Sequence, residues 1–309
     1  MKLTLCYVLV STPDDYFAEM ATVSMWTARH VMPECRVVLL MDPQTARSMS
    51  GVRAMCRDLA DEPRVVPVGD TDDPMTRSRW IKTTMRQHVA GDFLYLDVDA
   101  VPVKDLSLLL NEPGPVAAAL DGNTSASKFV FKDFERLTFE RMNWPFPIRP
   151  YFNSGVMWIR DHPDAHALFK EWHRLWQLAR RAAPPKDQPA LNYANQRLGG
   201  VIRELPPQMN ALFPAFLGGV KGARVLHYIG IRFEERDDTI FHRVVKHLRA
   251  EGQIDEEALV ETTRTGYAWT DRRSLRYHWA LGNYRTCAKI AWQRMRRDRD
   301  PEEDRDQRR

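Results

Sequence analysis

Residues 93–103 read FLYLDVDAVPV, and this stretch decides the fold. Phe93 to Leu96 form a strand of the buried type, which stops abruptly at Asp97-Val98-Asp99. In an open α/β sheet the ligand crevice lies at the carboxyl ends of the strands, so both carboxylates face that crevice. Carboxylate oxygens suit hard divalent cations, and a cation held there can in turn hold a diphosphate. Two aspartates that cap a turn would give the same pattern, so the segment alone leaves both interpretations open.

Short apolar runs alternate with helical patterns through the first half of the chain, which is typical of a mostly parallel sheet covered by helices. Strands are expected at residues 3–10, 36–41, 65–68, 93–96, 116–120, 151–159 and 224–228. Helices are expected at residues 73–88, 162–181 and 186–196. Beyond residue 237 the pattern is helical only. We therefore expect an α/β domain at residues 1–235 and a helical C-terminal extension at residues 236–309.

The segment after the first expected strand carries helix-start residues. Ser11 or Thr12 is expected to cap a helix, with Pro13 in its first turn. The preceding apolar run is too short for a secretion signal, and proline and aspartates stand where a cleavage site would follow. The four cysteines are scattered without a CxxC pair, as in a reducing compartment. A cytoplasmic location is therefore expected.

Three further motifs follow the aspartates: YFNSGVMWIR, KDQPALN and VLHYIG. In the first, a glycine inside an apolar strand indicates a bulge or the close approach of a ligand. In the second, Asp187 and Gln188 precede Pro189, which fits a helix start. In the third, His227 ends a strand. It is either a structural histidine or a third metal ligand, which would favour Mn²⁺ over Mg²⁺.

The four motifs, in this order, resemble those of glycosyltransferase family 8. These are retaining enzymes that include glycogenin and bacterial lipopolysaccharide galactosyl- and glucosyltransferases. The resemblance covers residues 1–232 and implies a GT-A fold, a Rossmann-like core that binds nucleotide-diphospho-sugars. It further implies transfer of a hexose from a UDP-sugar to a hydroxyl acceptor, with Asp97, Asp99 and His227 holding Mn²⁺ or, as the alternative, Mg²⁺.

The resemblance also assigns roles around the donor. It implies that Asp187 and Gln188 are the catalytic pair, with Gln188 beneath the anomeric carbon. The donor-binding residues that it implies are Ser11, Thr12, Tyr16, Arg79, Lys82, Val98, Asp121, Asn153, Ser154, Gly230 and Arg232. Arg79 and Lys82 lie three apart on one expected helical face, where a solvated charged surface is the alternative.

Two positions depart from the family pattern. The usual Asp-Gln-Asp ends here in Pro189. After the late H-x-x-G motif the family places a proline and a lysine that reaches the diphosphate, whereas this chain has Ile231-Arg232-Phe233. Arg232 could take the lysine's place, but arginine and lysine differ in reach and geometry.

Basic residues gather near the C-terminus, although the net charge is only +4. Residues 272–297 hold eight Arg or Lys residues and no Asp or Glu, interleaved with four aromatic residues. This composition fits an anionic membrane surface and a lipid-linked acceptor, besides a glycan or protein acceptor. The enzyme would then be peripheral at the inner face of the membrane. The alternative is a helical hairpin packed on the core with its aromatic residues inward. No motif supports nucleic-acid binding.

Two other functions fit parts of the sequence. A non-enzymatic sugar-nucleotide or glycan-binding protein could keep the fold, and the altered segment after Gly230 supports it. A sugar nucleotidyltransferase would normally carry a glycine-rich phosphate loop after the first strand. The segment STPDDYF contains no glycine.

Overall fold

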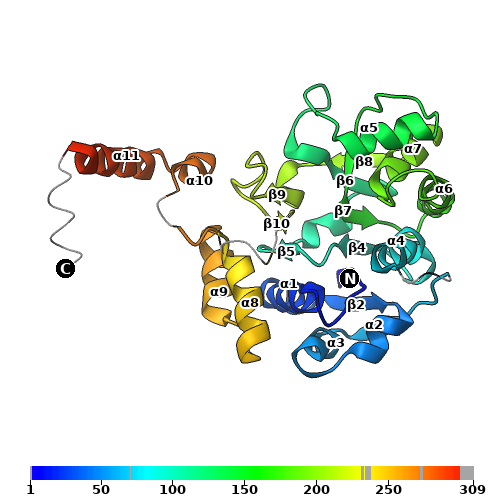
Figure 1. The fold of residues 1–309 in the computed structure, drawn as a ribbon, viewed down its shortest axis with the longest axis horizontal. Coiled ribbons are helices and arrows are strands. Elements are labelled where there is room, and N and C mark those ends of the chain that lie inside the picture. The colour runs from blue at the N-terminus through cyan, green and yellow to red at the C-terminus, as the bar shows by residue number, and fades with distance from the viewer. Residues whose placement is uncertain are drawn as a thin grey trace.

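The computed structural model of the chain describes residues 2–69, 71, 73–230, 233, 238–271 and 274–299. Within these residues, a seven-stranded sheet has the order β3-β2-β1-β4-β7-β6-β8 (Figure 1). Its strands are β1 (Thr4–Leu9), β2 (Arg36–Met41), β3 (Glu62–Val65), β4 (Phe93–Leu96), β6 (Val116–Leu120), β7 (Phe152–Ile159) and β8 (Ile202–Leu205). Only β7 runs antiparallel to its neighbours in this described sheet. The α/β prediction is confirmed, although β3 begins three residues before the strand expected at 65–68 and lies at the sheet's edge.

Helices cover both faces of this sheet because side chains alternate along its strands. On β1, Leu5, Tyr7 and Leu9 belong to the apolar cluster that includes α1 (Phe17–Val31) and α3 (Met55–Leu59). Cys6 and Val8 belong to the cluster on the other face. That cluster includes side chains of α4 (Pro74–Thr84), α6 (Pro163–Ala179) and α7 (Gln188–Arg197). The sheet is thus the middle layer of three.

Shorter elements complete the core. They are α2 (Pro43–Ser48), α5 (Asp133–Arg141) and the 3₁₀ turns η1 (Gly51–Ala54), η2 (Met85–Gln87), η3 (Ser107–Asn111), η4 (Asp121–Asn123) and η5 (Pro207–Asn210). A second described sheet has the order β5-β10-β9, with β5 (Ala100–Pro102), β9 (Ala211–Phe213) and β10 (Val225–Tyr228). In this sheet β5, which directly follows Asp99, pairs with β10, the strand that contains His227.

The start of α1 differs from the sequence prediction. The helix begins at Phe17, and Ser11 and Thr12 do not cap it. Instead, the Asp15 carboxylate accepts hydrogen bonds from the Ser11 hydroxyl at 2.7 Å, the Thr12 N–H at 2.7 Å and the Phe17 N–H at 3.0 Å. A carboxylate accepts hydrogen bonds more strongly than a hydroxyl, so Asp15 folds residues 11–16 into a turn before the helix starts.

The C-terminal helices are α8 (Ile240–Glu251), α9 (Glu256–Thr265), α10 (Leu275–Ala280) and α11 (Tyr284–Arg299). Buried residues of α8, among them Val244 and Leu248, share one apolar cluster with Val23 of α1 and Leu226 of β10. This part of the extension therefore packs directly on the α/β core. None of the helices in the described part of the chain is both long and apolar enough to span a bilayer.

Helices α10 and α11 reach away from the sheet at the far end of the molecule (Figure 1). Tyr277 is buried in the core cluster, with its ring 5.5 Å from that of Phe213. Trp279, Tyr284 and Trp292 are 66%, 58% and 51% exposed. The expected hairpin with inward aromatic residues is therefore right for Tyr277 and wrong for the other three.

Candidate active site

The pairing of β4 with β7 places Asp97 beside Gly155. Leu96 pairs with Val156, and the next N–H, that of Asp97, donates to the Gly155 carbonyl at 2.7 Å. The register of β7 against β6 shifts between Ala118 and Leu120, so β7 bulges at this point, as its sequence predicts. A Cβ on Gly155 would lie 2.2 Å from His227 Cε1 and 2.8 Å from Asp97 Oδ2. Only glycine lets the carboxylate and the imidazole approach the strand this closely.

The pairing of β10 with β5 brings His227 to the two aspartates. His227 lies opposite Ala100, so its Nε2 is 3.2 Å from Asp99 Oδ1 and 3.9 Å from Asp97 Oδ2. One ligand atom from each of Asp97, Asp99 and His227 lies within 4.8 Å of the other two. His227 Nδ1 is 2.9 Å from the side-chain amide oxygen of Asn210. With its proton on Nδ1, the neutral ring would present the Nε2 lone pair to a ligand. Two carboxylates and one oriented imidazole fit a divalent cation.

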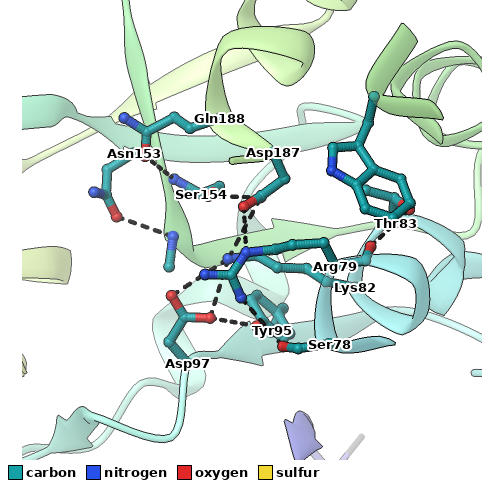
Figure 2. Close-up of polar contacts among 12 residues, drawn as sticks. Ser78, Arg79, Lys82, Thr83, Tyr95, Asp97, Asn153, Ser154, Asp187 and Gln188 are labelled. Atoms are coloured by element: carbon teal, nitrogen blue, oxygen red, sulfur yellow. Dashed lines mark hydrogen bonds and ion pairs between the residues drawn. The ribbon is translucent and has the colours of Figure 1, made fainter. Parts of the chain in front are cut away.

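The charges of the site favour ionised Asp97. Burial raises the pKa of Asp97, but the positive charges of Lys82, His227 and Arg79 outweigh burial and lower it to about 2. Lys82 Nζ lies 3.0 Å from Asp97 Oδ1, and the Tyr95 hydroxyl donates to the same carboxylate (Figure 2). For His227, burial lowers the pKa, and the carboxylates of Asp99 and Asp97 more than reverse this effect.

Arg79 and Lys82 connect this cluster to Asp187. Arg79 Nε is 2.8 Å and Lys82 Nζ is 3.7 Å from the Asp187 carboxylate (Figure 2). The Lys82 side chain is only 2% exposed, so the pair is no solvated surface, and this alternative is wrong. The nearby Arg77 has a different task, since it forms a buried ion pair with Asp42 at 2.9 Å.

Amide side chains hold the other wall of the site in one arrangement. Both oxygens of Asp121 accept at 3.0 Å, one from the Asn153 amide and the other from the Gln188 amide. The Gln188 carbonyl accepts from the Ser154 N–H at 3.2 Å, and the Ser154 hydroxyl donates to Asp187 at 3.2 Å (Figure 2). These residues come from η4, β7 and the start of α7, so three elements meet at one point.

Two cavities meet at the aspartates. One, of about 440 Å³, is lined by Val8, Leu9, Val10, Thr12, Asp15, Phe17, Asp73, Pro74, Met75, Ser78, Arg79, Tyr95, Asp97, Val98 and Asp99. The other, of about 270 Å³, is lined by Arg79, Lys82, Asp97, Asp99, Asp121, Lys132, Phe134, Asn153, Ser154, Gly155, Lys186, Asp187, Gln188, His227, Ile229 and Gly230. Arg79, Asp97 and Asp99 line both, so two of the three candidate metal ligands lie at the junction and the third, His227, lines the smaller cavity.

Only some of the residues expected to bind the nucleotide line the larger cavity. Thr12 and Val98 line the larger cavity, whereas Ser11 is only 2% exposed and supports the Asp15 turn. The Tyr16 ring stacks on Phe233 with centroids 4.2 Å apart, and the Arg249 guanidinium lies 3.8 Å from the Tyr16 ring centre. Its neighbour Phe17 is 46% exposed and lines the larger cavity. The expected Arg232 lies outside the described residues.

Sequence reasoning missed several residues of the site. Asn210 joins two of its parts, since its amide donates to Asn153 at 2.9 Å while its carbonyl faces His227. It lies in a 3₁₀ turn without any motif. Lys132 and Phe134 stand at the start of α5, far in sequence from every motif. Lys186 was visible within KDQPALN, but nothing in the letters indicated that it faces the cavity.

No family model matches the chain, and no curated protein matches it in sequence. Among solved structures, it is similar to a galactosyltransferase, LgtC, in complex with donor and acceptor sugar analogs. That likeness has a TM-score of 0.54 at 16% identity and covers 87% of this chain and 97% of the other. An active-site glutamine mutant of LgtC gives the same TM-score and identity over 84% of this chain and all of that chain. The GT-A fold implied by the family 8 resemblance is confirmed.

Proposed function

We propose that the protein is a metal-dependent retaining glycosyltransferase that moves a hexose from a UDP-sugar to a hydroxyl acceptor. One observation carries the proposal: Asp97 and Asp99 line both cavities, and His227, which lines the smaller one, lies beside them. The site thus has three parts, a larger cavity, a smaller cavity and the carboxylates between them. A nucleotide sugar also has three parts, namely a nucleoside, a diphosphate and a sugar. The nucleoside would occupy the larger cavity and the sugar the smaller one, with the diphosphate between them at the carboxylates.

Asp97, Asp99 and His227 would hold the metal ion, which we propose to be Mn²⁺, with Mg²⁺ as the alternative. When bound, the ion supplies charge neutralisation for the departing nucleoside diphosphate. Asn210 orients the His227 ring through Nδ1, and Gly155 provides the space in which the ring and the Asp97 carboxylate meet. Such supporting contacts typically change metal affinity by about 10–100-fold when they are lost.

The smaller cavity offers fixed groups for a sugar. Asp121, Asn153 and Asp187 would bind its hydroxyls, because each presents polar atoms whose orientation the network holds. Gln188 would lie beneath the anomeric carbon. Its amide is held at both ends, by Asp121 and by the Ser154 N–H, so it enters the reaction already oriented.

We propose a front-face reaction without a covalent intermediate. The carboxylates near the expected anomeric position, Asp121 and Asp187, are engaged with amides or cations, so neither is a free nucleophile. The bond between the anomeric carbon and the phosphate oxygen would break as the bond to the acceptor oxygen forms on the same face. The acceptor proton would pass to the departing phosphate oxygen. Arg79 and Lys82 would stabilise the negative charge that builds there.

The base of the donor would stack on Phe17 and not on Tyr16. Phe17 is exposed in the larger cavity, while the Tyr16 ring already contacts Phe233 and Arg249. Thr12 and Val98 would contact the nucleoside in the same cavity, and Ser11 would act through the Asp15 turn. Gly230, which lines the smaller cavity, and Arg232 are the candidates next to the diphosphate.

The acceptor is a glycan, lipid-linked or protein hydroxyl, and the C-terminal residues would hold the enzyme at an anionic membrane. Exposed Trp279, Tyr284 and Trp292 on α10 and α11 can enter the interfacial region, with basic side chains beside them. The enzyme would then be cytoplasmic and peripheral at the inner face of the membrane. Residues 1–235 would be the catalytic unit and residues 236–309 the extension.

Donor hydrolysis tests the proposed function. The protein is incubated with UDP-glucose or UDP-galactose and Mn²⁺, with and without EDTA, beside the Asp99→Asn variant. We expect release of UDP that EDTA and Asp99→Asn both abolish. Nucleotide-sugar binding without UDP release, in the presence or absence of acceptors, would support a binding protein instead. Formation of UDP-sugar from UTP and a sugar 1-phosphate would support a nucleotidyltransferase.

A further inference from the structure

Two lysines of the smaller cavity take no part in the network described above. Lys132 precedes α5 and Lys186 precedes Asp187 at the start of α7, and both line the cavity. Within the described residues, neither ammonium group has a carboxylate at ion-pair distance. The lysines come from separate segments that converge on one wall. Their presence beside the sugar-binding amides therefore requires its own explanation.

The other ionisable groups of this cavity already have partners within the described residues. Arg79 pairs with Asp187 at 2.8 Å, and Lys82 pairs with Asp97 at 3.0 Å. Asp121 accepts from two neutral amides, and Asp99 lies beside His227. Among the described residues that line the cavity, Lys132 and Lys186 are the cationic side chains without an ion-pair partner.

The environment of Lys186 makes this charge unfavourable in the absence of an anion. Burial lowers the pKa of Lys186, the charges of Arg79, Lys132 and Lys82 lower it further, and the charge of Asp187 opposes them. A carboxylate or phosphate bound between the two lysines would relieve this repulsion. Charge-assisted hydrogen bonds to such a group are also stronger than those between neutral groups.

An aromatic ring completes the wall. Phe134 is partly buried, lines the same cavity and lies with its ring centre 5.9 Å from Lys132 Nζ. Ligand sites commonly combine such an apolar surface with a few placed polar groups. The wall therefore presents an apolar face for a sugar ring and two ammonium groups for an acidic substituent on that ring.

We propose that the smaller cavity selects a sugar that carries an anionic group, a carboxylate or a phosphate, which Lys132 and Lys186 bind. The inference rests on the proposed function for the identity of the cavity as the sugar site. The anionic sugar is either the donor's own, as in a UDP-uronic acid, or the acceptor. Both sources share one chemistry, and the test separates them.

The experiment measures binding by calorimetry with Mn²⁺ present. In the donor arm, UDP-glucuronate is compared with UDP-glucose and with UDP. In the acceptor arm, methyl glucoside 6-phosphate is compared with methyl glucoside on protein saturated with UDP. Both arms use the wild type and the variants Lys132→Met and Lys186→Met, which keep the apolar stem of the side chain. Lys128 is exposed like Lys132 and lies four residues before it, but it does not line the cavity, so Lys128→Met provides the control.

We expect the anionic ligand of at least one arm to bind the wild type more tightly than its neutral partner. Each lysine variant should weaken that ligand about tenfold or more, because the ligand loses a hydrogen bond between two charged groups. The neutral ligand and UDP should change less than about twofold, and Lys128→Met should change nothing measurable.

Three results would overturn the inference. If charged and neutral ligands bind alike in both arms, the cavity does not select an anionic sugar. If the lysine variants weaken UDP as much as the charged ligand, the lysines bind the diphosphate instead. If no form of the protein binds UDP, the proposed function fails together with this inference, whereas UDP binding without charge preference refutes the inference alone.

Discussion

Gly155→Ala tests whether the close approach at β7 builds the metal site. The backbone of Gly155 does not have a positive φ, so alanine can adopt it, and the effect of the change is purely steric. The new methyl group would lie 2.2 Å from His227 Cε1, 2.8 Å from Asp97 Oδ2 and 3.0 Å from His227 Nδ1. To restore an ordinary carbon–carbon contact of about 3.5–4.0 Å, the imidazole must recede by about 1.3 Å or more.

This displacement is large for a metal site and modest for the fold. Ligand distances in metal sites hold within about 0.2 Å, so a shift of this size removes His227 as a ligand. Loss of supporting contacts alone costs about 10–100-fold in metal affinity, and we expect at least about 100-fold here. Overpacking of a core typically costs about 1–3 kcal/mol, so the variant should remain folded with a lowered melting temperature.

The assay is a titration with Mn²⁺, followed by calorimetry or electron paramagnetic resonance, beside a thermal unfolding curve. Gly114→Ala serves as the control, because Gly114 is also buried but lies at the amino end of β6, away from the crevice, against the flexible side chain of Arg203. The control should bind Mn²⁺ like the wild type. A folded Gly155→Ala protein with wild-type Mn²⁺ affinity would refute the steric argument.

Three further outcomes follow from particular side chains. Burial, helped by the charge of Asp121, raises the pKa of Glu135 from 4.5 to about 7, although hydrogen bonds from the Lys132 N–H and Tyr151 oppose this shift. Between these two pH values the folded state therefore holds a proton that the unfolded state releases. The free energy of unfolding should fall by up to about 3 kcal/mol as the pH rises through this window, and Glu135→Gln should abolish the fall; parallel melting-temperature profiles from pH 4.5 to 8 would contradict this. Phe17→Ala should weaken UDP binding about tenfold or more at unchanged Mn²⁺ affinity, and equal binding would exclude stacking on Phe17. Trp279→Ala with Trp292→Ala should lower binding to anionic vesicles without loss of stability, and an unchanged vesicle pull-down would disprove membrane docking. Point substitutions are used because a deletion of residues 271–309 would also remove buried Tyr277.

The long apolar strands and the order of the motifs could be predicted from the sequence, because burial on both faces leaves a continuous apolar run. The strands β5 and β9 could not, since three residues carry no period. The predicted start of α1 was wrong because the hydroxyl groups of Ser11 and Thr12 and the carboxylate of Asp15 compete as acceptors for the same N–H groups. Only the folded turn shows that Asp15 is the acceptor.

Some residues of the candidate site could likewise be predicted from a local sequence pattern, and others could not. Asp97 and Asp99 were visible because a local pattern, a strand that ends in carboxylates, marks them. The contact of His227 with Asp99 depends on the register of β10 against β5, which no local pattern encodes. The burial of Lys82 and the part of Asn210 likewise depend on segments far apart in sequence.

The cooperation between Mn²⁺ and UDP tests the central claim most directly, since binding through one shared site must be reciprocal. UDP is titrated with and without Mn²⁺ into the wild type, Asp99→Asn and the control Asp58→Asn, whose side chain is 71% exposed on α3. The account predicts that Mn²⁺ tightens UDP binding at least about tenfold in the wild type and the control, and not in Asp99→Asn. UDP binding that ignores Mn²⁺, or a full Mn²⁺ effect in Asp99→Asn, would contradict it.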